Sequence, residues 1–111
     1  MRELNLINYS TKVKEIKDGK LLDKIEPYNV KEALIAILFM PGNNVTAREA
    51  FKRQILADKI EMSNGSILLE EAEWQKLVDA ADKLNNVGRN DIEFLHRILD
   101  APQIEVKKDE Q

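Results

Sequence analysis

The chain has 111 residues, of which 43% are hydrophobic and 33% are charged, and its formal net charge is -3. This composition excludes global disorder and collagen-like repeats, and the length suits one hydrophobic core rather than two. Cysteine is absent and histidine occurs once, which excludes disulfides, thiolate metal sites, cysteine nucleophiles and any site that needs two imidazoles from one chain.

The first 28 residues have the character of a β-hairpin. Residues 11–17 and 20–25 are extended runs, and Asp18-Gly19 between them suits the two positive φ angles of a type I′ turn. Lysine-rich strands are typical of exposed sheet edges. The side of the hairpin that we expect to be buried carries Leu21, Leu22 and Ile25.

The next segments are predicted helices, because three of them begin with a capping box. The boxes are Asn29 with Glu32, Thr46 with Glu49, and Asn90 with Glu93. The stretch from Ala33 to Met40 is apolar on every face, so its helix is expected to lie inside the protein. A buried strand is the alternative for so short a run. Residues 66–69 form a short strand or a linker.

The helix that starts after Thr46 and runs to about Ser63 has two apolar faces. At about 100° per residue, Ala47, Phe51, Ile55 and Met62 lie on one side, and Leu56 and Ile60 lie nearly opposite. A surface helix needs one apolar face. The helix is therefore either enclosed within the monomer or buries its second face against another chain, and we predict self-association. The predicted interface residues are Phe51, Leu56, Ile60 and Trp74.

One flank of the same helix is basic. Arg48, Lys52 and Lys59 could hold an anionic small ligand or a phosphate backbone, although a solvated face explains the same three charges. The apolar character of the preceding helix and its proline-glycine loop argue against a helix-turn-helix. An anionic small ligand is therefore one expectation for this flank, whereas binding of nucleic acid is not expected.

The C-terminal part contains two further predicted helices. Residues 70–86 show an apolar stripe that includes Trp74, and the last helix follows Asn90 and ends near Asp100 before Ala101-Pro102. Together with the hairpin, these elements predict an α+β, mostly helical fold, in which an N-terminal β-hairpin packs on about four helices. The predicted organisation is a single compact domain, 1–102, and a charged C-terminal tail, 103–111.

Catalytic and targeting signals are missing from the sequence. No nucleophile elbow, phosphate-binding loop, dinucleotide fingerprint or EF-hand pattern occurs. His96 lies at the edge of the apolar stripe of the last helix, where a boundary role is expected. We interpret the chain as a non-enzyme without cofactor or metal. Without a secretory signal or a membrane-spanning run, it is expected in the cytoplasm and not in a membrane.

Several strings resemble small accessory proteins of tailed bacteriophages and prophages. They are P-Y-N-V-K-E-A-L at 27–34, L-L-E-E-A-E-W at 68–74 and G-R-N-D-I-E-F-L-H-R-I-L-D-A-P at 88–102. The resemblance implies a protein of a bacterial host cell that acts by binding a host or phage partner, in assembly, host takeover or anti-defence. We expect a homo-oligomeric interaction protein; the alternatives are a sponge for an anionic ligand such as a signalling nucleotide, and a DNA-binding regulator.

Overall fold

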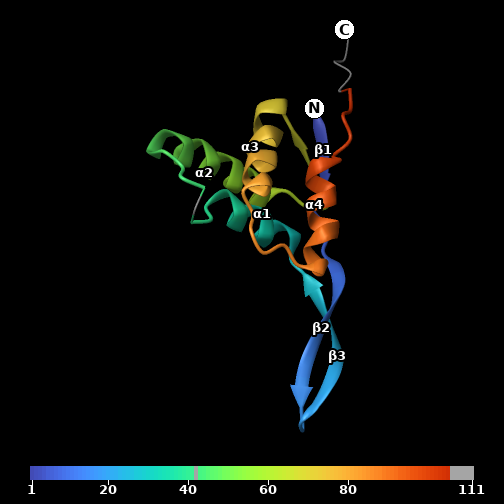
Figure 1. The fold of residues 1–111 in the computed structure, drawn as a ribbon. Coiled ribbons are helices and arrows are strands. Elements are labelled where there is room, and N and C mark those ends of the chain that lie inside the picture. The colour runs from blue at the N-terminus through green and yellow to red at the C-terminus, as the bar shows by residue number, and fades with distance from the viewer. Residues whose placement is uncertain (42, 106–111) are drawn as a thin grey trace.

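Four helices and two small antiparallel sheets form the part of the chain that the computed structural model describes, residues 1–41 and 43–105 (Figure 1). The predicted α+β, mostly helical fold is thus confirmed. The elements in chain order are β1 (Arg2–Asn5), β2 (Tyr9–Lys17), β3 (Lys20–Tyr28), α1 (Val30–Leu38), α2 (Ala47–Met62), β4 (Ser66–Leu69), α3 (Glu71–Asp82), a 3-10 turn (Arg89–Asp91) and α4 (Ile92–Leu99).

Strands β2 and β3 form the predicted N-terminal hairpin. They pair in antiparallel register from Tyr9 opposite Tyr28 to Lys17 opposite Lys20. Asp18 and Gly19 have φ angles of 53° and 73°, as the turn type requires. The hairpin projects away from the helices as an arm (Figure 1). The expectation that one side of its distal part is buried is wrong, because Leu21, Leu22 and Ile25 are exposed.

The base of the hairpin is held by two tyrosines. The rings of Tyr9 and Tyr28 stack with centroids 4.8 Å apart, and Phe94 of α4 packs against Tyr28. The Tyr9 hydroxyl donates to the carbonyl of Asn90 over 2.7 Å, and the Tyr28 hydroxyl donates to the Asp91 carboxylate over 2.8 Å. Only the base of the hairpin therefore packs on the helical body.

The second sheet joins the chain start to the segment after α2. Strand β1 pairs antiparallel with β4, with Leu4 opposite Ile67, so residues 66–69 are a strand and not a linker. Gln103 forms an isolated bridge with Arg2, and the amide of Ile104 donates to the Met1 carbonyl over 2.8 Å. The described part of the predicted tail therefore lies beside β1. Residues 106–111 lie outside the described residues.

The core is built from one face of each helix and the β1–β4 sheet. Its largest fully buried side chains are Phe94, Leu4, Leu34, Leu38, Leu56, Ile60, Leu69, Leu77, Ile98 and Val30. Five of them lie on α1 or on α2, which contacts α1, and this agrees with the predicted central place of the first helix. One flank of α1 nevertheless stays open, because Ala36 and Met40 are exposed. The expectation of a helix buried on every face is therefore only partly met.

Two predicted helix boundaries differ from the structure. Helix α3 ends at Asp82 rather than near Asn86, because the chain turns toward the 3-10 segment. The capping box of Asn90 with Glu93 does not form. The 3-10 turn precedes α4, and the Asn90 amide instead donates to the Lys12 carbonyl at the base of the hairpin. A tertiary hydrogen bond thus replaces the expected local one.

Candidate functional site

The outer face of α2 carries large apolar side chains that the rest of the described chain leaves uncovered. Phe51, Ile55 and Met62 are 73%, 69% and 85% exposed. At 100° per residue they fall within about 40° of one another around the helix, so they share one side of α2, with the exposed Asp58 between Ile55 and Met62. We call these three residues the α2 ridge. Large apolar side chains grouped on one face mark an interaction surface more often than single exposed ones do.

The opposite face of α2 belongs to the core. Leu56 and Ile60 are 2% and 0% exposed and pack in the main hydrophobic cluster. Of the four predicted interface residues, Phe51 therefore lies on an open surface, whereas Leu56 and Ile60 are buried within the monomer. The prediction that these two form an interface is wrong for the folded chain. The two-faced pattern itself is real, since one face is covered by the chain and the other is not.

Trp74, the fourth predicted interface residue, is half-buried on α3. Its indole Nε1 donates to the Ile98 carbonyl over 2.7 Å, and the Arg2 guanidinium lies 4.0 Å from its ring centroid. These contacts join α3 to α4 and to the chain start. Trp74 thus stabilises the fold and does not share a surface with the α2 ridge.

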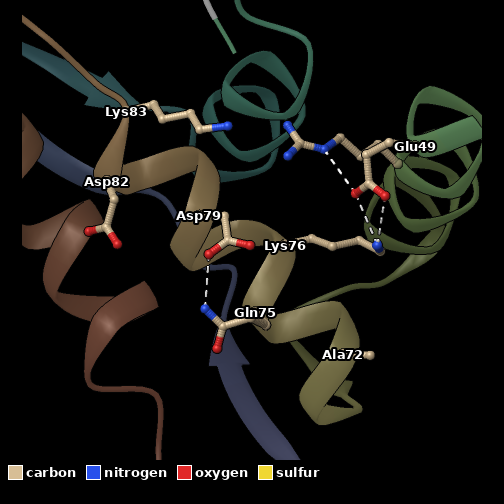
Figure 2. A pocket seen from close by; sticks show the side chains of 8 residues that line it. Glu49, Ala72, Gln75, Lys76, Asp79, Asp82 and Lys83 are labelled. Atoms are coloured by element: carbon tan, nitrogen blue, oxygen red, sulfur yellow. Dashed lines mark hydrogen bonds and ion pairs between the residues drawn. The ribbon is translucent and has the colours of Figure 1, made fainter. Parts of the chain in front are cut away.

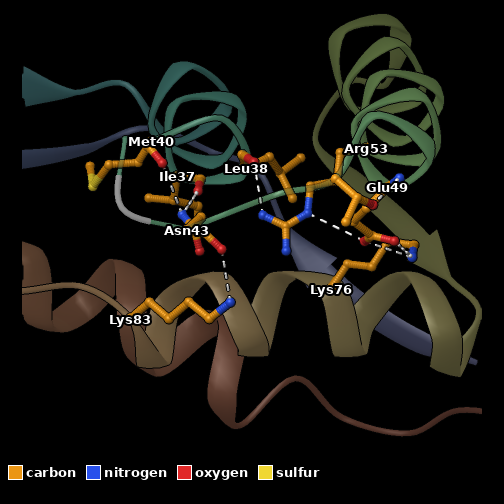
Figure 3. Close-up of polar contacts among 9 residues, drawn as sticks. Ile37, Leu38, Met40, Asn43, Glu49, Arg53, Lys76 and Lys83 are labelled. Atoms are coloured by element: carbon orange, nitrogen blue, oxygen red, sulfur yellow. Dashed lines mark hydrogen bonds and ion pairs between the residues drawn. The ribbon is translucent and has the colours of Figure 1, made fainter.

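A buried arginine joins α2 to the end of α1 (Figure 3). Arg53 is 4% exposed, and its Nη1 donates to the Leu38 carbonyl over 2.8 Å. The last carbonyls of a helix have no partner within it, so this bond caps α1 from a neighbouring helix. The buried Asn43 adds a second cap, because its Nδ2 donates to the Ile37 carbonyl over 3.0 Å.

A polar groove with a volume of about 550 Å³ lies between α2 and α3 (Figure 2). Its cations are engaged within the chain. Arg53 and Lys76 both contact the Glu49 carboxylate, at 3.3 Å and 2.9 Å, and Lys83 donates to the Asn43 carbonyl over 3.1 Å. The three cations of the groove therefore join α3 to α2 and to the loop before it.

We expect the ion pairs of Glu49 in this groove to make the stability of the fold sensitive to acid. The hydrogen bond from Lys76, with a further one from Arg53, lowers its pKa below the ordinary value of 4.5. A carboxyl whose pKa is lower in the folded state stabilises the fold at pH values above its ordinary, unfolded-state pKa. This stabilisation is lost as the pH falls through the folded-state pKa. We expect Glu49→Gln to flatten the fall in free energy of unfolding below about pH 4.5, measured by urea denaturation across pH. An unchanged pH slope would contradict this assignment.

The predicted anion-binding residues do not converge on a pocket. Arg48 and Lys52 are exposed on α2, and Lys59 is bound to Glu73 over 2.8 Å. Lys59 thus joins α2 to the start of α3. The three residues remain on one flank of the α2 ridge, as the sequence spacing indicated.

The hairpin arm carries the second uncovered apolar surface. Directly opposite residues of paired strands share a sheet face, and alternate residues along a strand do so as well. Ile16 lies opposite Leu21, and Lys12 opposite Ile25, so Ile16, Leu21 and Ile25 lie on one face of the ribbon. All three are exposed. We call them the arm strip.

The other candidate residues among those described do not form a catalytic or metal site. The only histidine, His96, is exposed, and its Nδ1 lies 2.6 Å from the Asp100 carboxylate one turn further along α4. Within residues 1–41 and 43–105, no three acidic or histidine side chains are grouped as a metal site. No helix in the same residues is long and apolar enough to cross a membrane.

Comparisons with protein-family models, with curated proteins and with solved structures gave no match. The surfaces of this chain therefore indicate its function, and among the described residues the α2 ridge and the arm strip contain the six most exposed large apolar side chains.

Proposed function

We propose that the chain is a non-enzymatic interaction protein that self-associates through the outer face of α2. The supporting observation is the α2 ridge, in which Phe51, Ile55 and Met62 are each at least 69% exposed. Burial of apolar surface contributes roughly 25 cal/mol per Å², so a second chain that covers the ridge gains free energy without any change in the monomer.

The charges beside the ridge favour a specific partner over unspecific aggregation. Asp58 and Glu61 lie on one flank, and Arg48 and Lys52 lie on the other. Opposite charges at the rim of an apolar contact steer association and set its register. The wider role, as a phage-type accessory protein that occupies a host or phage partner, is part of the same proposal.

Self-association is tested by replacing one ridge residue. We expect the native chain to increase in mass with concentration, and Ile55→Glu to remain monomeric under the same conditions, because a charge on the ridge cannot be buried without a partner. Sedimentation velocity and light scattering measure the mass. Ile92 on α4 is also exposed, at 58%, so Ile92→Glu is the matched control and should associate like the native chain.

A native chain that stays monomeric up to millimolar concentration would refute the proposed self-association. An Ile55→Glu variant that associates as well as the Ile92→Glu control would place the contact elsewhere on the surface.

A further inference from the structure

We infer that the partner of the α2 ridge is the hairpin arm of a second copy of the chain, so that copies join head to tail. This inference rests on the proposed self-association and names the surface that meets the ridge. The arm strip and the α2 ridge are both apolar, both exposed and both without a covering partner among the described residues.

The two surfaces belong to distant parts of one molecule. The chain measures 65 × 35 × 22 Å along its principal axes, and the arm points away from the helical body that carries α2 (Figure 1). The arm strip runs from Ile25, opposite Lys12 near the base, to Ile16 and Leu21 beside the Asp18-Gly19 turn. One copy cannot bring its own strip to its own ridge without unfolding the hairpin base, so the contact must join two copies.

The dimensions of the two surfaces match. The arm strip spans five residues of β3, from Leu21 to Ile25, and its four steps cover about 13 Å at the rise of a β-strand. The α2 ridge spans twelve residues, from Phe51 to Met62, and its eleven steps cover about 16 Å at the rise of a helix. The arm strip is therefore long enough to cover most of the ridge.

The charges around the two surfaces are complementary in one orientation. Lys12 and Lys14 on β2 share the face of the arm strip, and Asp23 on β3 lies on the same face between Leu21 and Ile25, where it pairs with Lys14. The ridge has an acidic flank, with Asp58 and Glu61, and a basic flank. Docking with β2 over the acidic flank places opposite charges together on both sides.

If the α2 ridges of two copies packed against each other as antiparallel helices, the charges on their flanks would not be complementary. In an antiparallel pair related by a two-fold axis, each flank of a helix meets the same flank of its partner. Arg48 and Lys52 of one copy would then lie along the basic flank of the other. The head-to-tail contact avoids this repulsion, and it can propagate because each copy keeps one free strip and one free ridge.

The test mixes two variants that each lack one surface. The arm variant carries Leu21→Glu and Ile25→Glu, and the ridge variant carries Ile55→Glu. All three side chains are exposed, so both variants should keep the native circular dichroism spectrum. We expect each variant alone to be monomeric and an equimolar mixture to form a 1:1 complex with the mass of two chains, because only one productive contact remains.

Leu22 lies on the opposite face of the arm and is exposed, so Leu22→Glu is the matched control and should associate like the native chain. If the arm variant alone still self-associates and the mixture forms no 1:1 complex, the ridge pairs with another ridge; the head-to-tail inference is then wrong and the proposed self-association stands. A native chain that is monomeric at millimolar concentration overturns both.

Discussion

Leu56→Ala is expected to lower the free energy of unfolding by about 3 kcal/mol, the typical cost of a large-to-small change at a fully buried leucine. Leu56 is 2% exposed and belongs to the main hydrophobic core cluster. Phe51, only five residues earlier, is 73% exposed. Phe51→Ala is therefore expected to change the stability by no more than about 0.5 kcal/mol. Urea denaturation at a concentration where the chain is monomeric measures both values.

This pair of variants separates the two faces of α2 without reference to any partner. Equal losses for the two alanine variants would mean that the described packing of α2 is wrong. The buried position of Leu56 and Ile60 also determines how self-association can be studied. Acidic substitutions at these two residues are expected to unfold the chain, so only the exposed Phe51, Ile55 and Met62 can report on the interface.

Arg53→Met is expected to cost about 2 kcal/mol, because a buried carbonyl then loses a charged hydrogen-bond donor. The Arg53 guanidinium donates to the last carbonyl of α1, at Leu38, and its Nε donates to Glu49. Methionine keeps most of the side-chain volume, so the loss reports mainly on the polar contacts. Thermal and urea denaturation both measure it.

Arg48→Met is the matched control, because Arg48 is exposed on the same helix and a surface change of this kind shifts stability by no more than about 0.5 kcal/mol. Arg53→Lys should lose part of the stability, since lysine cannot donate to both partners in the geometry of a guanidinium. Identical stabilities of Arg53→Met and the native chain would show that the cap on α1 contributes nothing.

Local signals in the sequence predicted most of the fold. Asn29 and Thr46 accept hydrogen bonds from the amides of Glu32 and Glu49 at the starts of α1 and α2, and the Asp18-Gly19 turn has the expected φ angles. Each of these features depends on residues no more than four positions apart. Local chemistry is sufficient to define such boundaries.

Features that depend on distant residues could not be predicted. The apolar pattern identified two faces of α2 but could not tell which one the core covers, because Arg53 is placed by a carbonyl fifteen residues earlier. The arm was expected to bury one side because apolar residues alternate along it. Whether a face of the hairpin packs on the helices depends on the length of the hairpin and on the contacts of the tyrosines at its base. The alternation of apolar and polar residues along the strands indicates neither.

The tyrosines at the base of the arm also determine how an assembly of copies would be shaped. Burial and the neighbouring Asp91 raise the pKa of Tyr28, so its hydroxyl remains a donor and the bond between hairpin and body persists in alkaline solution. Strands of nine residues reach about 30 Å, and a tilt of one degree at their root then shifts the far end by about half an ångström. The pitch of a filament would thus be set at this root, where a conservative change such as Tyr28→Phe could alter helical symmetry without weakening any subunit contact.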